Sequence, residues 1–198
     1  MGNKFWNPFT YIAGGKALII GLLGIVIAAF LGYIGSVHFD GVIDIHSGAA
    51  APYWLFIAEG LVNLFSISFF MYVAAIILSP SKVRVIDIIG TQAFTRLPML
   101  LPVAVASLFP LSKMNDYAMY RFAHIGEAVS LTNIEITGFV LFSLSTLVAM
   151  VWLVAWMYQG YKVSANLRGA KSVISFIIVL LLAEIIAFVF IRNILFHL

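Results

Sequence analysis

The sequence contains no cysteine and few charged residues. Without cysteine, the chain has no disulfide framework, thiolate metal site or thiol nucleophile. Charged side chains make up 10% of its 198 residues, whereas a soluble domain carries roughly 25%. The 11 Lys and Arg residues are spread over short segments rather than gathered on one face, so the formal net charge of +3 does not indicate nucleic acid as a partner.

Long apolar runs take the place of the missing charges. Hydrophobic residues account for 63% of the chain, and about 20 predominantly apolar residues in a row suffice for a helix to cross a bilayer. We therefore predict an all-α, polytopic membrane protein, with a single membrane domain over residues 1–198 and the lipid bilayer as its first partner. The five predicted transmembrane helices cover residues 17–34, 53–79, 90–111, 136–158 and 173–191.

The stretch WLVAWMYQGYKVSANLRGAK joins the fourth and fifth predicted spans. Its aromatic rings are of the type that favours a membrane–water interface, and its turn contains three basic residues and no acid. We expect this stretch to anchor the chain at the interface through Trp152, Trp156, Tyr161, Lys162, Arg168 and Lys171.

Basic residues also set the predicted orientation. Five crossings leave Lys113, Arg121 and Arg192 on one side of the membrane and the remaining Lys and Arg on the other. Because cytoplasmic loops are enriched in Lys and Arg, we expect the N-terminus inside and the C-terminus outside. The third span is short and contains Pro98 and Pro102. It is predicted to be a full but kinked crossing, because a re-entrant third segment would put the basic stretch outside.

The segment that leads into the third span has the pattern of an amphipathic helix. Its apolar and polar residues recur at helical spacing on opposite faces, which predicts a helix on the cytoplasmic surface. The apolar face consists of Ile86, Ile89, Ala93 and Leu97, and the polar face of Arg84, Asp87, Thr91 and Thr95.

The segment between the first two spans reads HFDGVIDIH and contains candidate metal ligands. Two imidazoles and two carboxylates would share one face of an extended strand, and such groups bind divalent metals such as zinc or manganese. The alternative is a short strand or an Asp-Gly hairpin whose polar side lies in water. The four candidate ligands are His38, Asp40, Asp44 and His46; we assign no cofactor to them.

Three polar side chains inside predicted spans are candidate binding residues. Glu59 and Asn63 are four residues apart in the second span and share a helix face, although Glu59 is also close enough to the outer end to reach the headgroups. Glu184 lies near the centre of the fifth span, where an ionised acid costs about 2.5–3.5 kcal/mol on insertion scales. Glu184 is therefore expected to be paired, open to a wet cavity, or neutral and hydrogen-bonded between helices.

Two motifs carry a resemblance to a known family. The first is GTQAFTRLP at Gly90–Pro98, and the second is the pattern of Trp152, Tyr161, Arg168, Gly169 and Lys171. Together with the five-span plan, they resemble the Yip family of Ypt/Rab-interacting-protein type, especially its short prokaryotic members. The long N-terminal region and DLYGP-type motif that associate eukaryotic members with Rab GTPases are absent from this sequence. The resemblance implies a protein of the bacterial cytoplasmic membrane and supplies no catalytic residue.

Three classes of function are compatible with these patterns. The leading hypothesis is a non-enzymatic membrane protein that acts through helix or partner contacts, as a homo-oligomer or with another membrane protein, in membrane organisation or trafficking-like roles. It rests on the lack of a phosphate-binding Gly loop and of a Ser-His-Asp order in the sequence. The second hypothesis is a small carrier or channel with a polar path at Glu59, Asn63 and Glu184. The third is a metalloenzyme built on the His38–His46 segment and His124.

Overall fold

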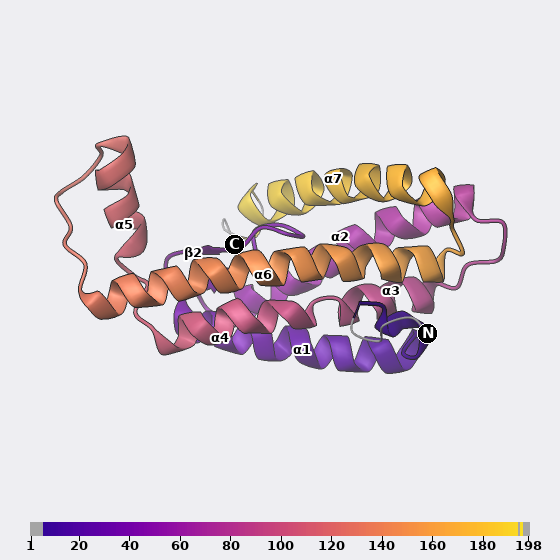
Figure 1. The fold of residues 1–198 in the computed structure, drawn as a ribbon, viewed down its shortest axis with the longest axis horizontal. Helices are drawn as coiled ribbons and strands as arrows, with labels where there is room; N and C mark the ends of the chain where they lie inside the picture. The colour runs from indigo at the N-terminus through magenta and orange to yellow at the C-terminus, as the bar shows by residue number, and fades with distance from the viewer. Residues whose placement is uncertain (1–5, 194, 196–198) are drawn as a thin grey trace.

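The computed structural model describes residues 6–193 and 195, and most of them are helical. Five helical segments are long and apolar enough to cross a membrane, so the chain is a multi-pass integral membrane protein, as its apolar runs predict. Large apolar side chains such as Ile77 and Leu108 are exposed along these helices, as expected for surfaces that face lipid. The five segments are α1 (Gly14–Gly35), α2 (Tyr53–Leu78), Val85–Leu108, α6 (Asn133–Ser164) and α7 (Gly169–Asn193), which run along the length of the molecule in Figure 1.

The third segment is broken in the middle, as its prolines predict. It comprises α3 (Val85–Phe94), the 3-10 turn η2 (Leu97–Met99) and α4 (Leu100–Leu108). Pro98 lies at the start of η2, where a proline has no N–H to continue the hydrogen bonds of the preceding helix. The break places Arg96 at the junction, midway along the segment.

The remaining elements are short. A 3-10 turn, η1 (Pro8–Thr10), precedes α1, and α5 (Met114–Ala118) continues into the π-helical turn η3 (Met119–Ala123). Figure 1 shows α5 above the first turns of α6, apart from the other helices. The two-residue strands β1 (Val37–His38) and β2 (His46–Ser47) form an antiparallel pair between α1 and α2.

Small residues allow α1 to pack closely on the third segment. A β-carbon on Gly21 would overlap the backbone of Ala93, and one on Gly24 would lie 2.5 Å from the side chain of Leu97. On the other side of the bundle, α7 packs mainly on α2. A large part of the core lies between these layers, around Ile67, Met71, Leu153 and Met157.

The expectation that α3 lies on the membrane surface is wrong. Its polar residues Thr91, Gln92 and Thr95 are fully buried. Burial is tolerated because Thr91 donates to the backbone carbonyl of Asp87 (2.8 Å) and Thr95 to that of Gln92 (2.7 Å), so each hydroxyl is satisfied within its own helix. Packing against α1, α2 and α6 encloses the second half of the expected polar face, at Thr91 and Thr95, whereas Arg84 at its start is exposed.

Candidate functional site

The connection between α1 and α2 enters the bundle instead of lying across its end. The two strands hold its ends together, with His38 opposite His46, and residues 39–45 form a loop between them, which we call the inserted loop. Val42, near its tip, is buried to 1% exposure. Side chains from α2, from the α3–η2 junction and from α7 hold this loop.

Glu59 of α2 holds the first residue of the inserted loop. Its Oε2 accepts the backbone N–H of Phe39 (3.0 Å), and its Oε1 lies 2.7 Å from Nδ1 of His38. Glu59 and His38 are both almost completely buried. The carboxylate of Glu59 therefore points into the protein and not towards the headgroups.

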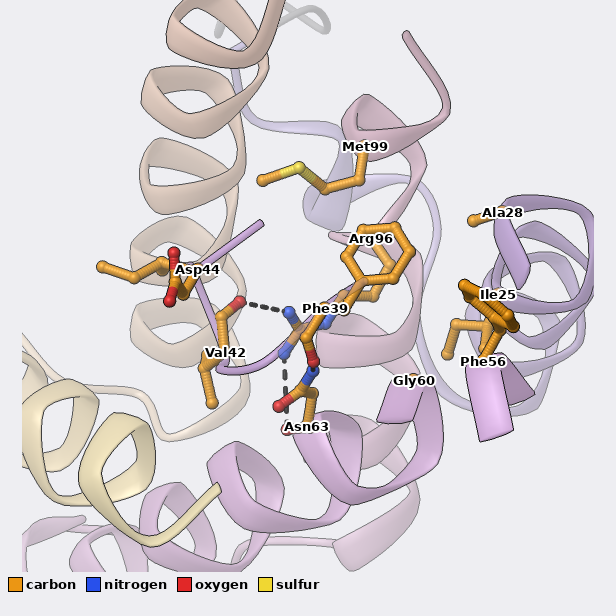
Figure 2. Close-up of a pocket in the computed structure, with 11 residues that line it drawn as sticks. Ile25, Ala28, Phe39, Val42, Asp44, Phe56, Gly60, Asn63, Arg96 and Met99 are labelled. Atoms are coloured by element: carbon orange, nitrogen blue, oxygen red, sulfur yellow. Dashed lines mark hydrogen bonds between the residues drawn. The ribbon is translucent and has the colours of Figure 1, made fainter. Parts of the chain in front are cut away.

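Asn63 and Arg96 hold carbonyl groups of the inserted loop. The amide of Asn63 donates to the backbone oxygen of Phe39 (2.8 Å). The guanidinium of Arg96 donates to the backbone oxygens of Val42 and Asn63. Figure 2 shows Arg96 between these two acceptors, on the side of the loop that faces the α3–η2 junction. Arg96 is 8% exposed and Asn63 2%.

Glu184 of α7 holds the tip of the inserted loop from the opposite side. Its Oε2 accepts the backbone N–H of Ile43 (2.9 Å). Gly41 lies directly against the same carboxyl group, and a β-carbon at position 41 would overlap it. The charge of Arg96 also acts on Glu184, so the carboxylate has both a hydrogen-bond donor and a nearby cation.

These contacts lie deep in the bundle. Asn63 follows the first residue of α2 by ten positions, which is roughly 15 Å along a helix and about half of the ~30 Å hydrocarbon core. Non-helical backbone at such a depth is tolerated only where protein or water satisfies its polar groups. The side chains of Glu59, Asn63, Arg96 and Glu184 supply that satisfaction.

Two histidine–carboxylate pairs lie at the mouth of the inserted loop. Nε2 of His38 faces the backbone oxygen of Ala49 (2.8 Å) while its Nδ1 faces Glu59, and an imidazolium ion, which donates from both nitrogens, fits this arrangement. Burial lowers the pKa of His38, but the hydrogen bond and charge of Glu59 outweigh it and raise that pKa above its usual 6.5. The second pair joins His46 to Asp40 (3.1 Å), and burial raises the pKa of Asp40.

The four-ligand metal face expected from the sequence is not formed. Among the described residues no group of three or more His, Asp or Glu could hold a metal ion. The strand pair does bring the rings of His38 and His46 together, with centroids 5.7 Å apart. Each ring, however, pairs with a different carboxylate, and Asp44 is exposed and belongs to neither pair. The loop between the strands turns inward and breaks the alternation of an extended chain.

A small cavity adjoins the inserted loop beside Arg96 and Asn63. Its volume of about 30 Å³ has room for one or two water molecules. Apolar side chains such as Ile25, Phe56 and Met99 form most of its wall (Figure 2), and Glu184 is not among the residues that line it.

The expected interface anchors divide into two groups. Trp156 packs against Phe9 and Phe94, which also contact each other. Tyr161 is fully buried, with its hydroxyl bonded to Ser175 (3.1 Å). Neither side chain faces the surroundings of the bundle, because α6 extends to Ser164 and its aromatic face packs inside the protein. The other four lie nearer the surface: Trp152 and Lys162 are half-buried, and Arg168 and Lys171 are exposed.

Sequence reasoning missed Arg96 and Gly41 as members of this site. Arg96 is counted there with the basic residues on the cytoplasmic side of the membrane, although the predicted third span, residues 90–111, includes it. A usable signal was its position near the middle of a 24-residue helical segment. Gly41 is assigned to a hairpin, and nothing in its neighbourhood indicates contact with Glu184, which lies 143 positions further on.

Comparisons of the chain with protein-family models, curated proteins and solved structures found no match. The Yip resemblance rests on the two sequence motifs and the five-span plan, and it stays a prediction.

Proposed function

We propose that this chain is a non-enzymatic, Yip-type membrane protein that acts through contacts with other membrane components. The proposal rests on what the polar side chains within the predicted spans bind. Glu59, Asn63, Arg96 and Glu184 all bind the backbone of the inserted loop, so they are engaged in holding the structure. The adjoining cavity of about 30 Å³ is too small for an organic solute.

Reconstitution into liposomes tests this proposal. Vesicles containing the purified chain and a pH-sensitive dye, under an imposed proton gradient, are expected to leak no faster than empty vesicles. Chemical crosslinking in native membranes is expected to capture a second copy or another membrane protein at a fixed ratio. Proton or solute flux that is removed by Glu184→Gln, in a variant that keeps its melting temperature, would contradict the proposal.

The second candidate function is a small carrier in which the inserted loop is the gate. One observation favours it: the polar residues predicted to line a path, Glu59, Asn63 and Glu184, reach the same loop from two different helices. Outward movement of the loop would expose all three at once. In that case a disulfide between the loop and α7, introduced into this cysteine-free chain, would abolish flux and its reduction would restore it.

The proposal includes a location and an orientation. The bacterial cytoplasmic membrane follows from the Yip resemblance. An inside N-terminus and an outside C-terminus follow from the distribution of Lys and Arg residues along the sequence. Arg96 no longer counts in that distribution because its side chain is buried.

A further inference from the structure

A groove opens on the side of the bundle between α6 and α7. Its volume is about 530 Å³ and its wall is apolar throughout. Val151 and Val173 are exposed at its rim, so the groove faces the surroundings of the bundle, which in a membrane are hydrocarbon chains. Val151, Val154, Ala155 and Tyr158 of α6 line it, together with Val173 and Phe176 of α7.

Near the α6–α7 turn the groove is closed by a contact between two hydroxyl groups. The hydroxyl of Tyr158 is 3.0 Å from that of Ser172, which joins the two helices there. The ring of Tyr158 also packs edge-on against Phe176. Nζ of Lys162 lies 5.9 Å from the centre of the Tyr158 ring, which places a cation directly beyond the apolar wall.

The end of the groove is basic. Lys162, Arg168 and Lys171 occur within the stretch 152–171, which contains no Asp or Glu. Within residues 6–193 and 195, none of these three side chains forms an ion pair. Arg168 and Lys171 are exposed, so their charges are available to a ligand at the membrane surface.

We propose that this groove binds an anionic phospholipid. One acyl chain lies along the α6–α7 groove, and the phosphate group lies at the basic end, within reach of Lys162 and Lys171. Basic pockets between transmembrane helices bind anionic headgroups in this way. A zwitterionic headgroup adds a cation at the end that is already basic, so charge complementarity selects the anionic lipid. The inference is independent of the function proposed above.

Native mass spectrometry of the full chain tests the site. The purified protein is titrated with phosphatidylglycerol or with phosphatidylcholine bearing the same acyl chains. We expect one phosphatidylglycerol to be retained with an affinity at least about tenfold above that of phosphatidylcholine. The double variant Lys162→Gln, Lys171→Gln is expected to lower the affinity for phosphatidylglycerol roughly 25-fold, because each basic residue near an anionic lipid contributes about fivefold. Arg121→Gln, which removes an exposed charge from the segment between α5 and α6, is the matched control and should have no effect.

A second variant tests the apolar part of the site. Ala155→Phe fills the groove and is expected to reduce binding of both lipids at an unchanged melting temperature. If it lowers the melting temperature, Val151→Phe at the exposed rim provides the same test. Equal affinity for the two lipids, or equal behaviour of the double lysine variant and Arg121→Gln, would overturn the proposal. Undiminished phosphatidylglycerol binding in the variant with the filled groove would also overturn it. So would full competition by soluble glycerol phosphate, which would show that only the phosphate is bound. A dimer of the wild-type chain that dissociates when the groove is filled would show that a second copy occupies the groove instead.

Discussion

Gly41 lies against the carboxyl group of Glu184, although the two residues are 143 positions apart in the chain. The contact leaves no room for a side chain at position 41. It also allows the next part of the loop to turn so that Ile43 donates its N–H to the same carboxylate (2.9 Å). One glycine thus determines how deeply the loop enters the bundle.

Gly41→Ala is expected to push the inserted loop away from Glu184. The added β-carbon has no free space, and overpacking of this kind costs about 1–3 kcal/mol. The measurement is the melting temperature in detergent. Gly15→Ala is the control, because a β-carbon there meets no atom within 4 Å. An unchanged melting temperature for Gly41→Ala would show that the carboxyl group of Glu184 is not held against position 41.

Arg96→Met is expected to destabilise the protein by about 3 kcal/mol. The variant leaves the backbone oxygen of Val42 without its donor and removes the cation next to Glu184, and both losses are costly for buried groups. Equilibrium unfolding in mixed detergent measures the change. Arg121→Met, at an exposed position, should cost far less. Equal losses for the two variants would mean that Arg96 does not hold the loop.

Stability is expected to fall as pH rises above 6.5. The folded-state pKa of His38 is raised above 6.5, so the proton is bound more tightly in the folded protein. Its contribution is complete below pH 6.5 and is lost as pH rises through the folded pKa. Melting temperatures between pH 6 and 8.5 measure this dependence. His38 faces Glu59, Asp40 and the ring of His46.

Two variants assign the pH dependence to the His38–Glu59 pair. Glu59→Gln removes the charge that raises the pKa of His38, so the curve should flatten between pH 6.5 and 8.5. His124→Asn, at an exposed position with a left-handed backbone that Asn tolerates, should retain the wild-type curve. A wild-type slope in Glu59→Gln would refute the assignment.

The proposed topology predicts opposite labelling of two single-cysteine variants. The chain has no other thiol, and Arg121 and Arg168 are both exposed. A membrane-impermeant maleimide should label Arg121→Cys in intact cells and Arg168→Cys only after the membrane is opened. Labelling of both from the same side would refute the five-crossing orientation.

The helices could be predicted from the sequence because their signal is local. A run of apolar residues long enough to cross a bilayer has few alternatives, and all five predicted spans coincide with helices or, for the third, with a kinked helical segment. The period of α3 also identifies its polar face. What covers that face depends on α1, α2 and α6, and no local pattern encodes those contacts.

The inserted loop could not be predicted for the same reason. An alternating segment such as HFDGVIDIH is typical of a surface strand, and the groups that hold it are spread over α2, α3–η2 and α7. The sequence singles out Glu59, Asn63 and Glu184 as costly polar residues in apolar runs. All three bind backbone groups of the inserted loop, and backbone groups are the same in every residue, so the sequence does not reveal them as partners.

Glu59, Asn63, Arg96 and Glu184 hold the backbone of Phe39, Val42 and Ile43 inside the bundle. Hydrogen exchange of the purified protein measures this directly, with the exposed stretch 124–128 as internal reference. The amides of Phe39 and Ile43 should exchange orders of magnitude more slowly than the reference, and Arg96→Met should accelerate them. Exchange of residues 39–45 as fast as that of the reference would contradict the account.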